Sequence, residues 1–297
     1  MRVCAVLDIP FITLDLEKEY KRDVVDYMIR EYKEGRTPNP DVMCNKEIKF
    51  GAFLTFALKN GADFVATGHY SQKIFNFQFS IFNLKEGKDK NKDQSYFLWT
   101  LTQAELKHIL FPVGHLQKQE VRKLATKFKL PQATRKDSQG LCFLGQIDMK
   151  EFLKDYIKTK KGSVLDEKGN KIGEHDGAIL YTLGERHGFQ VFNKKTESEP
   201  LYVVAKDVEK NTIMVTPKKL QHTQKSQGAP LVSRNTNWIS GEAPKEEVKC
   251  RFRYRQEKIP CKILGNQVIF EKSQMIASGQ SIVFYDDQIC LGGGIIV

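Results

Sequence analysis

The chain has 297 residues, 40% of them hydrophobic and 10% aromatic, and 47 Lys and Arg against 36 Asp and Glu give a net charge of +11. This composition supports two or three buried cores and excludes a mainly disordered chain. No stretch approaches the about 18 apolar residues of a membrane span, and the first residues lack the apolar core of a secretory signal. The positive charge favours a polyanion such as nucleic acid as a partner, with lysine-rich solvation as the alternative.

In chain order, residues 9–16 (IPFITLDL) have the pattern of a short strand. Apolar residues then recur at helical spacing over residues 20–32, and Gly35 can end that helix. Residues 37–41 (TPNPD) predict a rigid loop, because two prolines and an Asn disfavour regular structure.

A second helical stripe covers residues 50–58 and stops at Gly61, and residues 62–70 then predict a strand that ends in GHY. This alternation of helices and strands predicts a parallel α/β sheet. In such sheets ligands gather at the carboxyl ends of the strands, so Gly68 and His69 are expected at a ligand-binding edge.

Two more elements precede a change in the sequence pattern near residue 147. Residues 71–90 predict a hairpin with a lysine-rich turn, and residues 121–128 form an amphipathic helical pattern. After a short helix near 148–158, Gly-rich strand-like segments follow, and the short strands from 231 onward are typical of a small β-barrel. We therefore expect three domains, an α/β domain, a small central domain and a C-terminal β-barrel, at residues 1–146, 147–218 and 219–297.

Six cysteines are present, and none has the spacing of a CxxC or zinc-finger motif. In a chain of this length without a signal, reduced thiols in a reducing compartment are the default expectation. Four of the cysteines lie in apolar segments and are expected to be small buried hydrophobic residues; these are Cys4, Cys250, Cys261 and Cys290.

Cys44 and Cys142 differ, because both lie in predicted loops beside polar or charged neighbours. A helix expected to begin near residue 45 and the nearby Lys46 would both favour the thiolate form of Cys44. Glycines around Cys142 would let a ligand approach the backbone. On this pattern alone, the two thiols either exchange a disulfide or pass a sulfur atom, or are both inert.

Three further clusters have two readings each. His69 is either a ligand-site residue or a hydrogen-bonded structural histidine. Residues 92–94 (KDQ) are either functional or a solvated turn, and residues 250–256 (CRFRYRQ) suit either phosphate contact with base stacking or a strand with one basic face. The terminal LGGGIIV is not a phosphate-binding loop, because no helix follows it.

Seven motifs occur together and in order, and they become specific only as a set. Over essentially the whole chain from about residue 9, they closely resemble the tRNA-uridine 2-sulfurtransferases, the tRNA-specific 2-thiouridylases. The motifs are GRTPNPDVMCNKEIKF (35–50), ATGHY (66–70), KDQSYFL (92–98), FPVGHLQKQEVRKLA (111–125), RKDSQGLCFLG (135–145), YTLGERHGF (181–189) and RFRYRQ (251–256).

The resemblance implies an adenine-nucleotide α-hydrolase-like α/β domain of ATP pyrophosphatase type, a central tRNA-binding domain and a β-barrel. It implies 2-thiolation of the wobble uridine in tRNAs for Lys, Glu and Gln, in which ATP, with Mg²⁺, adenylates the uracil 2-oxygen. Cys142 would carry a persulfide and Cys44 would be the second catalytic cysteine, with a transient disulfide between them. Asp41 matches the acidic residue proposed for acid/base work, and no metal ligand of the protein itself is expected.

The resemblance also assigns binding positions. Asn39, Pro40 and Asp41 would surround the flipped-out base, and Gly68 would touch ATP. The expected partners are tRNA and a protein that donates persulfide sulfur, in the cytoplasm and without a membrane. The positions that match tRNA contacts are His69, Lys92, Asp93, Gln94, Arg253, Tyr254 and Gln280.

Two departures from the family pattern stand out. The chain contains no SGGxDS, the loop that holds the pyrophosphate of ATP in the family. We therefore expect an N-terminally truncated chain that is inactive alone, from a fragment, a wrong start codon, a split gene with a separate N-terminal partner, or a degraded gene. Glu185 stands where the family usually has Gln.

The departure leaves other functions open. The chain could be a non-catalytic tRNA-binding protein. A general thiol–disulfide oxidoreductase fits poorly, since neither cysteine belongs to a CxxC motif.

Overall fold

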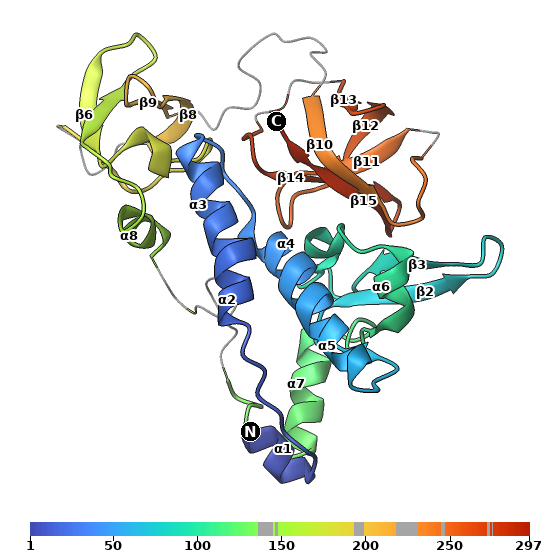
Figure 1. Cartoon of the computed structure of the whole chain (residues 1–297). Helices are drawn as coiled ribbons and strands as arrows, with labels where there is room; N and C mark the ends of the chain where they lie inside the picture. The colour runs from blue at the N-terminus through green and yellow to red at the C-terminus, as the bar shows by residue number, and fades with distance from the viewer. Residues whose placement is uncertain are drawn as a thin grey trace.

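The computed structural model of the chain describes residues 1–135, 145, 148–192, 199–217, 231–244, 247–271, 274 and 276–297. An α/β region, a small central sheet and a C-terminal barrel form three bodies, and a long helix runs between the first two (Figure 1). In the part of the chain so described, no helix is both long and apolar enough to cross a bilayer.

The long helix is continuous through α2 (Glu17–Tyr20), the π-helical η1 (Lys21–Val25) and α3 (Asp26–Lys33). Its apolar stripe, which includes Val24 and Met28 at 1% exposure each, is buried, and Gly35 follows with φ +74°. The helix predicted from residues 20–32 is therefore confirmed.

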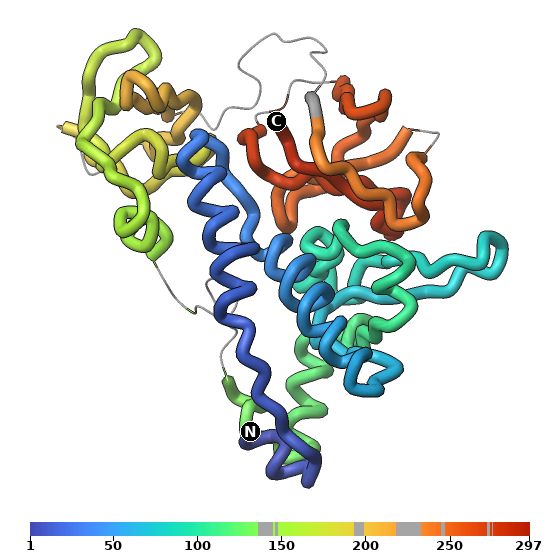
Figure 2. Tube along the Cα trace, in the orientation of Figure 1, coloured from blue at the N-terminus to red at the C-terminus, as the bar shows by residue number. Residues whose placement is uncertain are grey.

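The strand predicted at residues 9–16 is wrong. The chain forms α1 (Arg2–Leu7) and then an extended, unpaired segment that leads to α2 (Figure 2). A strand requires a neighbour for its backbone groups, and no described strand pairs with this segment. Ile12 is 74% exposed there.

The second helix joins α4 (Pro40–Met43), the π-helical η2 (Cys44–Phe53) and α5 (Leu54–Lys59), and Gly61 follows with φ +86°. The helix thus begins inside the segment predicted as a loop. Asn at the N-cap and Pro at the first helical position both favour a helix start, and this local preference outweighs the turn signal of the two prolines.

A parallel pair of strands follows this helix, as predicted, but it is very short. β1 (Val65–Ala66) pairs with β4 (Ile109–Leu110), with Val65 opposite Ile109. The strand predicted over residues 62–70 is therefore confirmed only at its centre, and Gly68 and His69 lie beyond its carboxyl end as expected.

The predicted hairpin is formed by β2 (Ser71–Asn76) and β3 (Ile81–Glu86). Its turn contains residues 77–80 and no lysine, and Lys88, Lys90 and Lys92 instead follow β3. Three helices complete the region: η3 (Ser95–Leu98, 3₁₀), α6 (Gln103–His108) and α7 (Lys118–Lys127).

In its described residues, the central body contains one α-helix, one 3₁₀ helix and a five-stranded sheet of order β7-β6-β5-β9-β8. Val164, Val203 and Ile213 are fully buried in it and belong to the same core cluster as the apolar face of α3. Its elements are α8 (Met149–Lys154), β5 (Gly162–Leu165), β6 (Lys171–His175), η4 (Ala178–Leu180, 3₁₀), β7 (Phe189–Val191), β8 (Tyr202–Asp207) and β9 (Thr212–Thr216).

The C-terminal strands form a barrel of order β10-β13-β12-β11-β14-β15, closed by pairing of β10 with β15. The hairpin of the α/β region extends the same sheet, since Lys85 and Leu84 of β3 pair with Ile289 and Cys290 of β15. The strands are β10 (Leu231–Trp238), β11 (Val248–Arg251), β12 (Ile259–Leu264), β13 (Gln267–Ile269), β14 (Ser281–Asp286) and β15 (Ile289–Ile296).

The glycines of LGGGIIV serve this packing. A Cβ on Gly293 would lie 2.5 Å from the Ile282 carbonyl oxygen and 2.9 Å from the Trp99 ring, so only glycine lets β15 approach both. The three glycines lie within β15.

Candidate functional site at the junction of the three bodies

The first turn of α4 carries the TPNPD motif. Asn39 caps the helix, and its side-chain oxygen accepts a hydrogen bond from the Val42 amide at 3.4 Å. Asn39, Pro40 and Asp41 are all partly exposed, whereas Cys44 is fully buried one turn later. Cys44 therefore lies inside a helix, not at its N-terminus as expected, and Lys46 is paired with Glu47 at 2.8 Å.

Asn45, the neighbour of Cys44, fixes this turn of the helix to the end of β1. Its amide nitrogen donates to the Phe97 carbonyl at 3.2 Å, and its oxygen lies 3.1 Å from Nε2 of His69. Nδ1 of His69 lies 2.9 Å from the Thr67 hydroxyl. Burial, and secondarily Lys49, lowers the pKa of His69 to about 3, so the imidazole is neutral.

His69 is thus the hydrogen-bonded structural histidine of the two alternatives. It is 7% exposed and packs against the rings of Phe50 and Phe111, at centroid distances of 5.6 and 6.1 Å. Gly68, directly before it, is exposed, and a Cβ there would meet nothing within 4 Å. An open backbone beyond the carboxyl end of β1 can accept a close ligand contact.

Thr37 joins all three bodies. Its hydroxyl lies 3.1 Å from that of Thr182 in the central body, and its amide donates to the Ser278 carbonyl at 2.8 Å. The Gln280 amide nitrogen donates to the Thr37 carbonyl at 2.7 Å. Gly279, with φ +89°, lies so close to Thr37 that a Cβ would come within 2.8 Å of its amide nitrogen. Gln280, one of the predicted site residues, therefore holds the loop that presents Asn39.

An aromatic group from the α/β region and the barrel borders the same loop. The Tyr254 ring lies 4.7 Å from Phe97 and 6.5 Å from Tyr96. The Tyr96 hydroxyl lies 3.1 Å from two barrel carbonyls, those of Phe252 and Ser281. Arg253 is exposed and donates to the Leu183 carbonyl at 3.3 Å.

The KDQ motif is mostly internal. Asp93 is 3% exposed, and its carboxylate accepts from the Arg251 guanidinium at 2.6 Å and from the amides of Gly87 and Ser95. The Gln94 side-chain oxygen accepts from the Tyr70 amide at 3.0 Å. Both residues therefore brace the region behind the site, whereas Lys92 is partly exposed.

Arg251 was not among the residues expected from sequence, although it belongs to the RFRYRQ motif. Its side chain is 8% exposed and pairs with both Glu86, at 2.8 Å, and Asp93. The sequence offered one signal for this pair, because the KDQ motif contains an acidic residue and the RFRYRQ motif contains arginines that could neutralise it.

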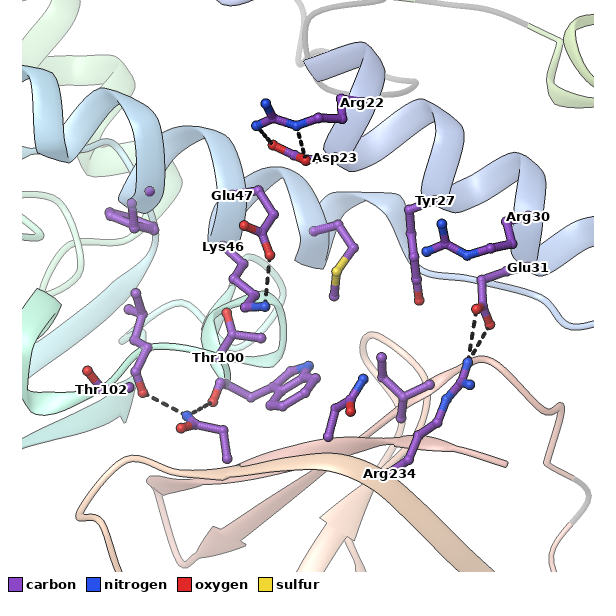
Figure 3. A pocket seen from close by; sticks show the side chains of 18 of the residues that line it. Arg22, Asp23, Tyr27, Arg30, Glu31, Lys46, Glu47, Thr100, Thr102 and Arg234 are labelled. Carbon is purple, nitrogen blue, oxygen red and sulfur yellow. Dashed lines mark hydrogen bonds and ion pairs between the residues drawn. The ribbon is translucent and has the colours of Figure 1, made fainter. Parts of the chain in front are cut away.

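A cleft of about 930 Å³ lies between α3, η2 and the barrel (Figure 3). Four of its five cations are in ion pairs, Arg234 and Arg36 with Glu31, Arg22 with Asp23 and Lys46 with Glu47, and the fifth, Arg30, lies over the Tyr27 ring. Trp99 Nε1, Thr100 Oγ1 and Arg234 Nε are buried there without a partner among the described residues. The cleft therefore offers hydrogen-bond donors and little net charge.

The other cysteines are mostly buried, and Glu185 is in an ion pair. Cys250, Cys261 and Cys290 are buried and free, as expected, and Cys4 is partly exposed. Cys142 lies outside the described residues. The Glu185 carboxylate pairs with Lys150 at 2.6 Å, so its extra charge is compensated.

Sequence models of three domain families match the chain in the order of its three bodies. They are the tRNA methyl transferase HUP domain over residues 1–146, the tRNA methyl transferase PRC-barrel domain over 150–217, and the aminomethyltransferase beta-barrel domain over 229–296. The fold is thus an α/β domain with a parallel sheet, a central PRC-barrel domain and a C-terminal β-barrel, as predicted.

Among curated proteins, the chain is 45% identical to a tRNA-specific 2-thiouridylase MnmA of Alkaliphilus oremlandii, over 99% of this chain and 82% of that protein. It is also 45% identical to those of Idiomarina loihiensis, over 99% and 81%, and Streptococcus thermophilus, over 98% and 79%. The chain belongs to the tRNA-specific 2-thiouridylase MnmA family.

Proposed function

We propose that this protein is a tRNA-uridine 2-sulfurtransferase that thiolates the wobble uridine of tRNAs for Lys, Glu and Gln. The observation that carries the proposal is the convergence of predicted site residues on one loop. Gln280 of the barrel holds Thr37 on that loop, which leads into the Asn39 cap one turn before Cys44. The family membership of the chain supports the same activity.

The proposed chemistry begins when the uracil 2-oxygen attacks the α-phosphate of ATP and pyrophosphate leaves. The terminal sulfur of a Cys142 persulfide then attacks carbon 2, and AMP departs with the oxygen. The Cys44 thiol attacks the inner sulfur of Cys142, which frees the thiouridine and leaves a Cys44–Cys142 disulfide. In the other order, Cys44 first frees sulfide from the persulfide. An external dithiol from outside the chain reduces the disulfide in either case.

Asp41 would transfer the proton in this proposal, and its partial exposure in the same helical turn as the Asn39 cap supports that role. Asn39 and Pro40 would contact the extruded base, which must leave the anticodon stack to reach this loop. The exposed backbone of Gly68 would contact ATP, and Mg²⁺ would accompany the phosphates of the nucleotide as their counter-ion.

The tRNA would lie across Arg253, Tyr254, Lys92 and Gln280, with His69 behind them. Arg253 is exposed and Tyr254 is partly exposed, which suits phosphate contact beside a stacked base. Asp93 would act from inside, through its ion pair with Arg251. The sulfur would come from a persulfide carrier protein, and we infer that the reaction occurs in the cytoplasm.

The 297 residues contain no SGGxDS sequence, so we expect a polypeptide of these residues alone to bind tRNA without adenylating it. The second candidate function is therefore tRNA binding without catalysis. Thiolation that appears only when a segment with the SGGxDS loop is added supports the enzyme. Thiolation by the 297 residues alone would show that the expectation about the loop is wrong.

The decisive experiment measures 2-thiouridine in tRNA nucleosides by mass spectrometry, with ATP, a sulfur donor and the SGGxDS segment present. Cys142→Ser and Cys44→Ser should each abolish thiolation and leave tRNA affinity nearly unchanged. The matched control, Cys4→Ser, alters a partly exposed cysteine and should retain activity. Thiolation by Cys142→Ser would overturn the persulfide assignment.

A further inference from the structure

The β2–β3 hairpin exposes phenylalanines at its tip. Phe77 is 85% exposed, Phe79 63% and Phe75 39%, and we call these three residues the aromatic tip. The Phe75 ring lies 5.0 Å from that of Phe77 and 5.2 Å from that of Phe82. The hairpin extends away from the rest of the chain (Figure 1), so the tip is open to a large partner.

The fold itself does not require these rings. The turn is formed by polar groups, because the Asn76 side-chain oxygen accepts from the amides of Gln78 and Phe79 at 3.1 and 3.4 Å. Ser80 then adopts φ +52°. Clustered exposed aromatic side chains of this kind indicate an interaction site more often than a folding requirement.

The charges around the tip are complementary to a polyanion. Residues 71–92 contain five lysines and two acidic residues, and both acids, Glu86 and Asp89, are buried at 4% and 7% exposure. Lys73 Nζ lies 4.6 Å from the centre of the Phe82 ring, which contacts Phe75 of the aromatic tip, and also donates to the Leu106 carbonyl at 3.0 Å. The exposed charge of the hairpin and the loop after it is therefore positive.

The size and spacing of the tip favour nucleic acid over protein. A stable protein interface buries about 800 Å² on each partner, more than a four-residue turn can supply. Phe75, Phe77 and Phe79 alternate with polar residues, and the Phe75 and Phe77 rings meet edge to face, which leaves the rings of Phe77 and Phe79 exposed at 85% and 63%. Separate aromatic rings beside lysines are the arrangement that holds unpaired bases by stacking.

We propose that the aromatic tip stacks on unpaired bases of RNA, while the lysines of residues 71–92 hold the phosphates. The inference rests on the proposed function in one respect, since it takes the RNA to be the tRNA substrate. The tip would then act as a second contact, separate from the loop that holds the target base.

The test measures binding of a fluorescent ten-nucleotide oligouridylate and of the tRNA to the full chain by anisotropy. Phe77→Ser with Phe79→Ser should weaken oligouridylate binding about tenfold to a hundredfold. The dependence of affinity on salt should stay the same, because no phosphate contact is removed. Lys85→Gln with Lys88→Gln should instead reduce that slope by roughly 0.7 for each lysine.

Phe128→Ser is the matched control, because Phe128 is 58% exposed at the end of α7, away from the hairpin. Unchanged affinity in the double Phe variant, or an equal loss in Phe128→Ser, would overturn the proposal. So would a double variant that loses only self-association in sedimentation or binding to phosphatidylserine vesicles. With the SGGxDS segment, ATP and a sulfur donor present, stacking without thiolation by the wild type would refute the proposed function alone, and thiolation with unaffected RNA binding by the tip variants would refute the tip alone.

Discussion

Nε2 of His69 lies 3.1 Å from the side-chain oxygen of Asn45, the residue that follows Cys44 in the chain. The Asn45 amide nitrogen is committed to the Phe97 carbonyl, so its oxygen must be the acceptor toward His69. The imidazole therefore carries its proton on Nε2 and accepts from Thr67 at Nδ1. A neutral histidine of fixed tautomer thus fixes the turn of helix that carries a candidate catalytic thiol.

His69 should make the fold sensitive to mild acid. Burial lowers its pKa from 6.5 to about 3, so the unfolded chain takes up a proton below pH 6.5 that the folded chain refuses. The free energy of unfolding should fall by up to about 2 kcal/mol between pH 6.5 and 5 from this group alone. Urea unfolding of the wild type and of His69→Gln at both pH values measures the difference.

His187→Gln provides the control, because His187 is exposed on the central body. It should keep the wild-type pH dependence, whereas His69→Gln should flatten it. An equal pH dependence in wild type and His69→Gln would show that His69 is not the buried, neutral group described here.

Arg251 should be one of the most sensitive positions in the chain. Arg251→Met leaves two buried carboxylates, Glu86 and Asp93, without their shared cation, and removing one partner from a buried cluster costs about 3–5 kcal/mol. Chemical denaturation should show a loss of that size. Lys171→Ala, which breaks an exposed pair with Glu174, should cost less than about 1 kcal/mol; similar losses in both variants would contradict the ranking.

Gln280→Ala should impair thiolation more than stability. It removes the hydrogen bond to the Thr37 carbonyl, worth about 1 kcal/mol, and frees the loop that presents Asn39. We expect the rate to fall about fivefold or more, with a nearly unchanged thermal midpoint. Gln267→Ala, on an exposed barrel strand, should change neither quantity. An unaffected rate in Gln280→Ala would show that the position of this loop does not matter for thiolation.

The cysteines should differ widely in their reaction with alkylating reagents. Burial raises the pKa of Cys290 to about 12 and also raises the pKa of Cys250, where the neighbouring Cys261 contributes the largest effect. Only thiolates react rapidly, so Cys290 should be alkylated roughly a thousandfold more slowly than an ordinary thiol at pH 8. Peptide mapping after brief iodoacetamide treatment should find the partly exposed Cys4 modified before Cys290. Early labelling of Cys290 would indicate that the barrel core opens easily.

Binding of tRNA should depend steeply on salt. With a net charge of +11 and six or more phosphates neutralised, affinity should fall about 10³-fold or more between roughly 50 and 200 mM salt. A filter-binding series at fixed pH measures the slope. A flat profile would remove the electrostatic part of the proposed RNA contact.

The helices and the barrel followed from sequence because their signals are local. The apolar stripe over residues 20–32 and the short strands after 231 each report their own element. Residues 9–16 misled because a strand depends on a partner elsewhere in the chain, which no local pattern can show. Pro40 misled in the other direction, because the same residue favours a turn and the first position of a helix.

The site was predictable to the level of motifs but not of contacts. The resemblance grouped Asn39, Gln280 and Tyr254, and the structure brings Gln280 to the Thr37 loop that leads to Asn39 and packs Tyr254 against Phe97. The burial of individual site residues could not be predicted from the motifs. Asp93 and His69 both became internal because their partners, Arg251 and Asn45, lie 158 and 24 residues away along the chain.

The pairing of β3 with β15 has a consequence for how such proteins can be recombined. Because Leu84 and Lys85 are hydrogen-bonded neighbours of Cys290 and Ile289, one sheet spans the join between the first and last thirds of the polypeptide. A chimera that swaps only the terminal barrel between two relatives would cut across that seam. Chimeras should fold when the β2–β3 hairpin and the barrel are exchanged together. The structural unit to exchange is therefore encoded by two separate parts of the gene.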